Sequence, residues 1–597
     1  MRATKLLCFV IFLLAGISST SQTTISLADF SAFKNPGKSW KLAGKVTANL
    51  EENNVLKYEK GTGILVNMPG KKEVGTDLFT NEEFADIDLE LDYMMAKNSN
   101  SGIYLQGRYE IQLHDSWGVS KVSPAINGGI YERYDESRGK GNEGYEGYAP
   151  RQNVSRAPGL WQHLKIAFQA PKFDASGRKT QNAKIISVEL NGIIIHENIE
   201  LRGPTRAAVD NNEVALAPLK FQGDHGTVAF RNISIKKYSG LPPVFADIHY
   251  SVYYSKHETI PDFSEMKADD EGTLLSLSTA FLKKDQEFVI RYTGNVIIKT
   301  TGDYIFQRET YGKGFVRINN KIVSDLASYT TDPIRLEPGT YPFEIIYLKP
   351  VNWLPSSLGL TVSAPGIREF LISDETSLYR EYPDPILVDA SDNIVHRSFM
   401  DIPDGPRVVH SANVGSPKQL HYSFDMDKGM VYQLWRGAFL DATAMWNGRG
   451  DGSSKPIGSR LILGKPHQTI LKLNSINDSV STDTLFTTKG YEIDKQNNTT
   501  FIYKIHGADV KDLLQVSENG EALRRTINIS NNPGNLYVNI AEGKIIENIS
   551  KGWYLVDDNS YYLRVDNSEV VPVIKQVNGR SVLIAPVQNT ISYSILY

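Results

Sequence analysis

The chain has 597 residues, too many for a single hydrophobic core, and the composition of an ordinary water-soluble protein. Its formal net charge is −4. A chain without a basic excess lacks the electrostatic footprint of a nucleic-acid partner or of an anionic membrane surface, so we exclude both.

Residues 1–21 have the form of a secretory signal peptide. Arg2 and Lys5 make the start basic, an apolar run from Leu6 to Gly16 follows, and small residues lead to a cleavage site near Ser21. This run is too short to cross a bilayer, and no later segment approaches the ~20 apolar residues that a spanning helix needs. We expect an exported protein of a bacterial periplasm or cell exterior with no stable membrane span; a retained membrane anchor is the alternative.

The only cysteine, Cys8, lies inside this leader. The processed chain is therefore expected to have no disulfide, no Cys-ligated zinc and no covalently attached haem. A large exported protein can do without disulfides because its cores are big enough to stabilise it.

From about residue 25 onward the local patterns are those of β-strands. Short alternating or β-branched runs are separated by Gly, Pro, Asn and Asp, and long helical periodicity is scarce. The clearest expected strands are Ala85–Tyr93, Trp161–Phe168, Ile185–Glu189, Val228–Ile235, Glu287–Tyr292, Tyr341–Tyr347 and Ser581–Ala585. We predict an all-β protein: a jelly roll over 22–238, a β-sandwich over 239–373 and another over 374–597.

The stretch from Asn100 to Asp115 is the most informative for function. If it were one strand, alternate side chains would share a face. One face would then carry Tyr104, Gln106, Arg108, Glu110, Gln112 and His114, and the other would be apolar. A continuous polar face suits a sugar with closely spaced hydroxyls, although one face of an antiparallel sheet can also simply be wet.

The region from about Ser26 to Tyr238 resembles the 3-keto-disaccharide hydrolase family, which has a concanavalin-like lectin/glucanase jelly roll. The motifs that carry the resemblance are Ser101–Gln106, Tyr109–Gln112 with Asp115, Pro158–Gln162, Ala170–Asp174, Asn191-Gly192, Gly203–Thr205, Leu219–Gly226 and Phe230–Ile233. The resemblance implies cleavage of glycosides that are already oxidised at C3 of the sugar. A 3-keto group acidifies the C2 hydrogen, so a modest base can remove it and the resulting enolate can expel the oxygen at C1.

Such a site needs a base near C2, a cation or donor facing the C3 oxygen, and a proton source for the departing oxygen. The candidate catalytic residues are Glu110, His114 and His225 as bases and Lys220, with Arg108, as the cation. The candidate substrate-binding residues are Tyr104, Gln106, Arg108, Gln112, Asp115, Trp117 and Gln222. His225 could instead pin a turn, and Asp115 could cap one.

No cofactor is predicted from spacing. A divalent metal held by Glu110, Asp115 or His225 stays open as an alternative, because none of these residues stands in a spacing that is specific for a metal. A glycine-rich stretch, Gly139–Gly147, interrupts the domain, and a long loop of this kind is typically functional or mobile.

Residues from about Ala246 to Ser373 resemble the protective-antigen-type β-sandwich of secreted carbohydrate-active proteins. The resemblance is carried by His249–Tyr254, Phe288–Gly294, Thr301–Phe306, Val316–Lys321 and Leu336–Pro342. Glycan-binding relatives carry paired acids after the Tyr-x-Phe strand that can hold calcium. Here that place reads Arg308-Glu309-Thr310-Tyr311-Gly312-Lys313-Gly314, so a calcium-dependent sugar site is not expected.

The last part of the chain, from about Leu378, resembles an uncharacterised β-sandwich of secreted bacterial proteins, some of which carry haem. This chain has no Cys-x-x-Cys-His, so no haem is expected. Trp435, Arg436, Asp441 and Trp446 could form an aromatic sugar platform, but buried, hydrogen-bonded tryptophans are the favoured interpretation.

These observations predict an exported carbohydrate-active protein whose substrate partner is an oligosaccharide or glycoside. Its N-terminal jelly roll would cleave 3-keto-glycosides by elimination or net hydrolysis, as the resemblance implies. A non-catalytic, lectin-like glycan-binding protein is the alternative, because a lectin needs the polar strand but no base. A surface protein whose domains act as spacers is a third interpretation, and the oligomeric state stays open.

Overall fold

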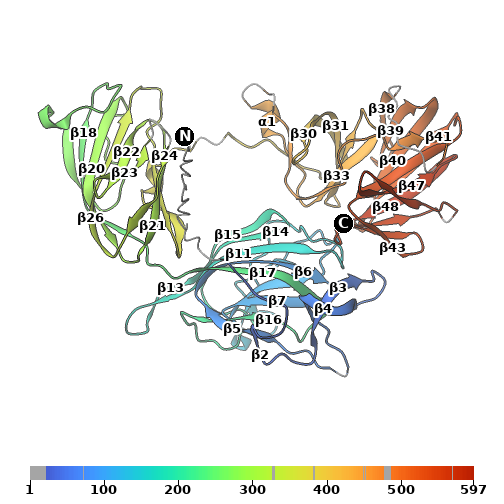
Figure 1. Cartoon of the computed structure of the whole chain (residues 1–597), viewed down its shortest axis with the longest axis horizontal. Helices are drawn as coiled ribbons and strands as arrows, with labels where there is room; N and C mark the ends of the chain where they lie inside the picture. Colours follow the sequence, from blue (N-terminus) through green and yellow to red (C-terminus); the bar gives the residue numbers. More distant parts are fainter. Residues whose placement is uncertain are drawn as a thin grey trace, which may run out of the picture. The chain divides into compact units, whose positions relative to one another are not determined.

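The computed structural model describes residues 22–71, 73–325, 330–380, 383–447, 450, 452–475, 486–567 and 569–597. The expected signal peptide and Cys8 lie outside these residues. Nearly all regular elements are strands, which confirms the predicted all-β class, and each of the seven segments named above overlaps a strand (Figure 1). No described helix is long and apolar enough to span a membrane.

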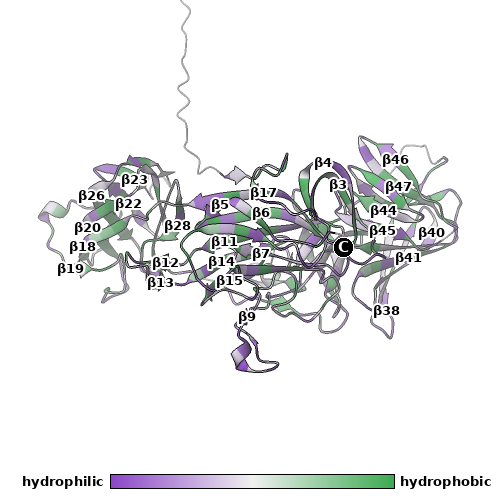
Figure 2. Cartoon of the chain, turned by 90° about the horizontal axis from the view of Figure 1, so that it is seen from below, coloured by the Kyte–Doolittle hydropathy of each residue, from purple (hydrophilic) through white to green (hydrophobic). Residues whose placement is uncertain are grey.

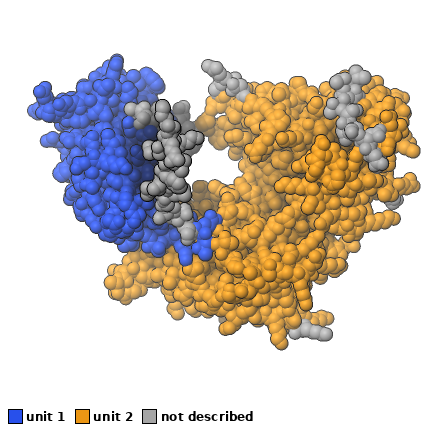
Figure 3. Space-filling model, viewed as in Figure 1, with its two compact units in different colours: residues 1–23, 236–381 blue, residues 24–235, 382–597 orange. Residues whose placement is uncertain are grey.

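By its internal contacts the chain separates into two compact units. Among the described residues, one comprises 22–23 and 236–381, and the other comprises residues 24–235 together with 382–597 (Figure 3). The N-terminal jelly roll and the C-terminal region therefore belong to one unit although 146 residues separate them in the chain (236–381).

The jelly roll consists of two sheets packed face to face. The larger sheet has the order β15-β14-β11-β6-β17-β4-β3, with β1 added beside β17. Its strands are β1 (Thr23–Thr24), β3 (Trp40–Ala48), β4 (Leu56–Asn67), β6 (Asp86–Met95), β11 (Gln162–Gln169), β14 (Ala183–Leu190), β15 (Ile193–Leu201) and β17 (Val228–Tyr238). The smaller sheet has the order β2-β5-β16-β7-β8. Its strands are β2 (Phe33–Lys34), β5 (Leu78–Phe84), β7 (Asn100–Leu105), β8 (Tyr109–His114) and β16 (Ala217–Phe221).

Alternation along the strands builds the core between these sheets. Ile87, Leu89 and Leu91 on β6 point into it, as do Ile111 and Leu113 on β8, and all five are buried. The opposite face of the smaller sheet is thereby left for polar side chains.

A short hairpin, β9 (Arg133–Tyr134) and β10 (Gly144–Tyr145), contains most of the predicted glycine-rich loop. It carries the 3₁₀ turn Glu136–Arg138 and projects from the jelly roll as a hydrophilic element (Figure 2). Its form is held by the Arg138 guanidinium, which lies 4.3 Å from the centre of the Tyr145 ring.

The C-terminal region is built from four sheets. The smallest contains β29 (Leu387–Val388), β34 (Leu440–Asp441) and β35 (Lys455–Pro456). A second small sheet contains β37 (Ile470–Lys472), β42 (Leu536–Gly543), β47 (Arg580–Pro586) and β46 (Val573–Val577). A third contains β30 (Ile394–Asp401), β31 (Arg407–Gly415), β32 (Leu420–Asp425), β33 (Met430–Arg436) and β36 (Ser459–Ile462). The largest contains β38 (Thr487–Ile493), β39 (Thr499–Ile505), β40 (Ala508–Val516), β41 (Ala522–Ser530), β48 (Thr590–Leu596), β45 (Tyr561–Val565), β44 (Trp553–Val556) and β43 (Ile546–Ser550).

The other unit is a β-sandwich of a seven-stranded and a four-stranded sheet. The first has the order β19 (Asp270–Leu274), β18 (Val244–Tyr253), β20 (Phe288–Ile298), β26 (Gly339–Lys349), β22 (Lys313–Ile318), β23 (Lys321–Asp325) and β24 (Thr330–Thr331). The second has the order β25 (Ile334–Leu336), β21 (Gly302–Thr310), β27 (Leu358–Ala364) and β28 (Ile367–Leu371). In its β21–β22 turn, the predicted place of a lost calcium site, the buried Arg308 donates to the Gly314 carbonyl at 3.1 Å.

The jelly roll and the C-terminal region share a hydrophobic core. Ala157 and Leu160 of the jelly roll are fully buried in the same cluster as the strands of the C-terminal sheets. Asn559 Nδ2 donates to the Gly159 carbonyl at 2.8 Å, and Trp117 Nε1 donates to the Tyr597 carbonyl at 2.9 Å. A core crossed by hydrogen bonds of this kind explains why the two regions form one unit.

The aromatic platform of the C-terminal region, the less favoured alternative, does not form. The Trp435 ring is fully buried and stacks on Phe439 with 5.6 Å between centroids. Arg436 is buried and donates to the Gly520 carbonyl at 3.0 Å, whereas Trp446, in the short helix α1 (Thr443–Trp446), is 68% exposed. Asp441 lies just before that helix and accepts from the Thr443 amide at 2.8 Å. Burial of the tryptophans, the favoured interpretation, is confirmed for Trp435 and is wrong for Trp446.

Candidate active site

The polar face expected between Tyr104 and His114 comes from a hairpin and not from one continuous strand. The chain reverses at Gln106–Arg108, where Gln106 and Gly107 have φ of 53° and 65°. The prediction of a single ribbon is therefore wrong. The three-residue turn nevertheless pairs Tyr104 with Glu110, so these two side chains still lie side by side on one face of the sheet.

At the centre of this face is a buried carboxylate. Glu110 is 3% exposed, and its Oε2 accepts a hydrogen bond from the Tyr104 hydroxyl at 2.7 Å. Its other oxygen, Oε1, lies 3.2 Å from the amide nitrogen of Gln112 in the amide orientation that satisfies the hydrogen bonding of that side chain. The backbone amide of Glu110 is held by Thr205 Oγ1 at 3.0 Å.

Burial governs the protonation of this pair. Desolvation raises the pKa of Glu110 to about 7, an effect that the Tyr104 hydrogen bond and the charge of Lys220 only partly oppose. Burial likewise raises the pKa of Tyr104, as does the neighbouring Glu110 charge. Near neutral pH, Glu110 can therefore take up or give up a proton while Tyr104 keeps its own.

Lys220, on β16, places a cation beside the pair. Its Nζ lies 3.6 Å from the centre of the Tyr104 ring and donates to the Ala207 carbonyl at 2.8 Å. It also forms an ion pair with Asp77 Oδ2 at 3.2 Å. An ammonium has three donors, and these contacts use two of them.

The loop between β15 and β16, residues 202–216, covers this face. It contributes the Ala207 carbonyl to Lys220 and the Arg206 carbonyl to the Tyr104 hydroxyl at 3.3 Å. Arg108 anchors the loop by donating to the Asn212 carbonyl at 2.5 Å and by pairing with Asp210 at 2.8 Å. Arg108 was predicted to lie beside Glu110; it points instead to this loop because it belongs to the turn.

Gln106, expected on the same face as Glu110, is also part of the turn. Its amide donates to the Phe84 and Ala215 carbonyls at 3.0 and 3.1 Å, so it joins the hairpin tip to its surroundings. Gln222, by contrast, follows Lys220 on the expected face and is buried, and its Oε1 makes no hydrogen bond with the described residues.

The two candidate histidines lie at different places. His225 is about half exposed, and its Nδ1 lies 2.5 Å from Asp224 Oδ1. The Asp224 carboxylate is near enough to raise the pKa of Glu110, which places this Asp–His pair at the rim of the Glu110 cluster. His114 lies at the far end of β8, where Nδ1 contacts Ser116 Oγ at 3.1 Å and burial lowers the pKa of the imidazole.

Two further residues that were predicted to bind substrate, Asp115 and Trp117, instead make structural contacts away from Glu110. Asp115 accepts from the amides of Asn98 and Trp117 at 2.7 and 3.3 Å, as in the turn-capping alternative. Trp117 is half-buried at the junction with the C-terminal region, where it donates to Tyr597.

No group of three or more His, Cys, Asp and Glu side chains suited to a metal ion occurs among the residues that the structure describes. Glu110 accepts from Tyr104, Asp115 accepts from the Asn98 amide beyond the end of β8, and His225 pairs with Asp224.

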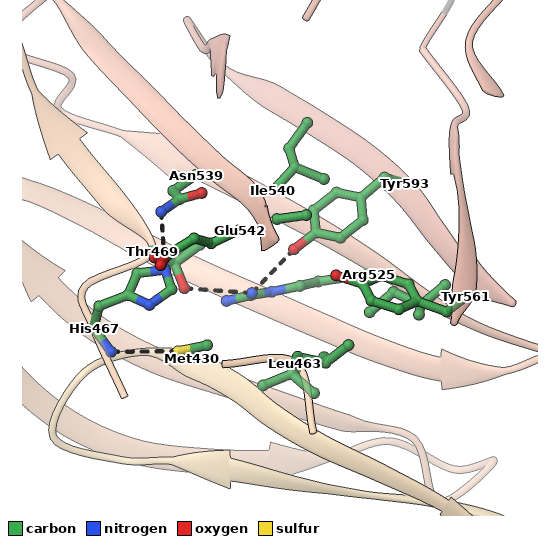
Figure 4. A pocket seen from close by; sticks show the side chains of 13 residues that line it. Met430, Leu463, His467, Thr469, Arg525, Asn539, Ile540, Glu542, Tyr561 and Tyr593 are labelled. Carbon is green, nitrogen blue, oxygen red and sulfur yellow. Dashed lines mark hydrogen bonds between the residues drawn. The ribbon is translucent and has the colours of Figure 1, made fainter. Parts of the chain in front are cut away.

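A small cavity in the C-terminal region is a second polar site (Figure 4). It measures about 20 Å³, room for about one water molecule. Arg525 lines it, and its guanidinium is held by other side chains: it pairs with buried Asp512 and donates to Tyr593 at 3.1 Å. His467 and Asn539 contact each other at 2.9 Å on its other side. This cavity is too small for a sugar and belongs to the core.

Residues 26–236 match the model of the 3-keto-alpha-glucoside-1,2-lyase-like domain, and residues 248–375 match that of the PA14 domain. The chain thus begins with a lyase-like domain and continues with a PA14 domain. It is a carbohydrate-active protein. No curated protein matched the chain.

Solved structures similar to the chain include two crystal structures from Parabacteroides distasonis named "putative glycosyl hydrolase". They are 21% and 22% identical, cover 36% and 33% of this chain and 83% and 98% of theirs, and have TM-scores of 0.24 and 0.20. An anti-sigma factor domain-containing protein from Clostridium clariflavum is 13% identical over 49% of this chain and 100% of its own, with a TM-score of 0.19.

Sequence reasoning missed two contributors to the Glu110 cluster: Asp77 and the Ala207 carbonyl. Asp224 was expected on one polar face with Lys220 and Gln222, because it continues their alternation along the chain. Asp77 precedes β5 and Ala207 lies in a loop, and neither position carries a local signal that links it to β7 or β8.

Proposed function

We propose that the lyase-like domain cleaves 3-keto-glycosides by removing the proton at C2 and eliminating the substituent at C1. The observation that carries this proposal is the buried Glu110, whose pKa of about 7 suits a general base at neutral pH and whose carboxylate bonds to a protonated tyrosine. We also propose that the protein is exported and acts in a periplasm or at a cell surface.

In the proposed reaction the Glu110 carboxylate takes the C2 proton, and the C–H electrons form an enolate with its charge on the C3 oxygen. Lys220 faces this oxygen and stabilises the charge, because a fixed cation in a dry site costs little reorganisation. The enolate then re-forms the ketone, creates a C1–C2 double bond and breaks the bond from C1 to the leaving oxygen.

Tyr104 supplies the proton that the leaving oxygen requires. It is restored by the proton now on Glu110 through their 2.7 Å hydrogen bond, so both side chains return to their starting states. The products are a 3-keto-1,2-unsaturated sugar and an alcohol; addition of water across the double bond would complete a net hydrolysis. Substrate would enter beside Asp77 and Asp224, whose side chains are 29% and 53% exposed.

The test is turnover of 3-keto-trehalose, followed by loss of substrate and appearance of free glucose. We expect wild-type turnover and a loss of at least ~100-fold in Glu110→Gln, the lower end of general acid–base contributions. His225→Ala should lose less, because that ring is half exposed at the rim.

Asp86→Asn is the matched control. Asp86 is also a partly buried acid of the jelly roll that pairs with a lysine, Lys172 at 2.7 Å, but it lies on β6 in the other sheet, outside the Glu110 cluster. Its turnover should stay near wild type. Near wild-type turnover in Glu110→Gln would refute the assigned base. Saturable binding of 3-keto-trehalose without any cleavage would favour the lectin-like alternative.

A further inference from the structure

A groove lies where the edge of the jelly roll meets the edge of the C-terminal region. It measures about 450 Å³, within the usual range of small-ligand sites. One wall comes from β3, β4 and the turn between them; the other comes from β43, β44 and β45. Both walls belong to the same compact unit. The groove is separate from the Glu110 cluster, which lies on the other sheet of the jelly roll.

We propose that this groove binds a neutral oligosaccharide of two or three sugar rings. The apolar part of the wall is the half-buried Trp553, with Leu50 from the jelly roll also packed against the shared core. The Tyr562 ring supports the indole edge-on at 6.4 Å, and its hydroxyl is tied to the Pro158 carbonyl at 3.1 Å. An indole held rigidly in a groove is a suitable surface for the C–H face of a sugar.

The polar part of the wall offers donors and acceptors at close spacing. Lys45 pairs with Glu547 across the groove at 2.9 Å, and the hydrogen bond to Glu547, followed by the charges of Glu547 and Glu59, raises the pKa of Lys45. Lys57 and Glu51 complete a lining set of two lysines and three glutamates. Because these charges nearly cancel, the site favours an uncharged ligand with many hydroxyls over an anion or a basic peptide.

An extended peptide is the competing occupant, because β3 and β43 are both edge strands of their sheets. The Lys45–Glu547 pair argues against it. This ion pair joins a residue of β3 to a residue of β43, so a strand added between the two edges would have to break it, whereas a sugar can hydrogen-bond to both partners in place.

The test uses the full chain and three probes: cellotriose, maltotriose and laminaritriose, each titrated calorimetrically. We expect saturable binding of at least one probe with a Kd below ~1 mM, and Trp553→Ala to weaken it at least ~10-fold. Ser550→Trp, which adds bulk at an exposed wall position, should abolish binding without removing any core atom. This second variant keeps the test valid if Trp553→Ala fails to fold.

Trp353→Ala is the matched control, because Trp353 is 81% exposed and lies in the PA14 domain; its binding should equal that of wild type. Turnover of 3-keto-trehalose should persist in Ser550→Trp, which separates this site from the proposed lyase site. The proposal is overturned if no trisaccharide binds, if both groove variants bind like wild type, or if a Thr-Val hexapeptide binds while the sugars do not.

Discussion

The Glu110 carboxylate fills the space that a side chain at Gly102 would need on the polar face of the hairpin. A Cβ atom at position 102 would lie 2.2 Å from Glu110 Oε1 and 3.0 Å from its Cδ. Gly102 faces Gln112 across the β7–β8 pairing, so the missing side chain leaves the space into which the Glu110 carboxylate bends. The position of the proposed base therefore depends on a glycine whose backbone is ordinary β-strand.

We predict that Gly102→Ala lowers turnover strongly while it changes stability little. The clash is with the far end of a flexible side chain, so Glu110 can rotate away, but it then loses its alignment with Tyr104 and with substrate. We expect at least ~10-fold lower kcat, since a misplacement of about 1 Å can cost more than that. Unchanged kcat for 3-keto-trehalose in a folded variant would contradict this.

The rate should rise with pH and level off above about pH 7. Burial first, and the Asp77 and Asp224 charges next, raise the pKa of Glu110 to about 7, and only the ionised carboxylate can take the C2 proton. Below that value kcat/KM should fall about tenfold per pH unit. A profile that stays flat down to pH ~5, near the pKa of an ordinary glutamate, would show that Glu110 is not the titrating base.

The same raised pKa predicts a stability difference between wild type and Glu110→Gln. A folded-state pKa of about 7 against about 4.5 unfolded means that the folded protein binds the extra proton between these pH values. Wild type therefore loses stability as pH rises through this window, and Glu110→Gln does not. The variant should gain ~3 kcal/mol relative to wild type between pH ~4 and ~8, measured by urea unfolding of both proteins at each pH. If the difference in free energy of unfolding between the two proteins stayed constant across this range, the raised pKa of Glu110 would be refuted.

The sequence was sufficient to predict the strands and the pairing of polar residues on one face, but not the turn. Gln106 adopts a positive φ, which is uncommon for glutamine, so only Gly107 marked the reversal. Because the turn has three residues, even-numbered residues on β7 and β8 still share a face. The prediction that Tyr104 and Glu110 lie on one face is therefore correct, although the prediction of a single strand is not. The prediction of a shared face is wrong for Gln106 and Arg108, which are the turn itself.

Contacts made by remote segments were beyond the sequence pattern. Asp77, Ala207 and Lys220 meet because β16 pairs with both β5 and β7, and alternation within one segment carries no information about such pairing. Trp117 likewise looked like a sugar-stacking residue because its partner, Tyr597, is 480 positions away. The boundaries at 22–238, 239–373 and 374–597 stay a prediction.

The shared core predicts that the jelly roll and the C-terminal region unfold together. Leu160 is fully buried among C-terminal side chains, so Leu160→Ala should lower the stability of that unit by ~2–5 kcal/mol. Leu360 is equally buried but lies in the PA14 domain, so Leu360→Ala should lower a different transition. Calorimetry of the full chain tests both. The shared unit would be refuted if each variant lowered the Tm of both unfolding transitions. It would also be refuted if Leu160→Ala split the transition of the unit formed by the jelly roll and the C-terminal region into two.

The PA14 domain should be indifferent to calcium because an arginine organises its β21–β22 turn. Arg308 is 8% exposed and donates to the Gly314 and Ile346 carbonyls at 3.1 and 3.4 Å, and burial lowers its pKa to about 10. Neither added calcium nor EDTA should shift the Tm of this domain by more than ~1 °C, whereas a calcium site would raise it with concentration.

Arg308→Met should destabilise the same domain by ~1–3 kcal/mol, because both carbonyls lose a buried donor. Arg335→Met, at an arginine whose side chain is 56% exposed, should change its stability by less than ~0.5 kcal/mol. A rise in Tm with calcium, or equal stability of the two variants, would show that the Arg308 contacts do not hold this turn.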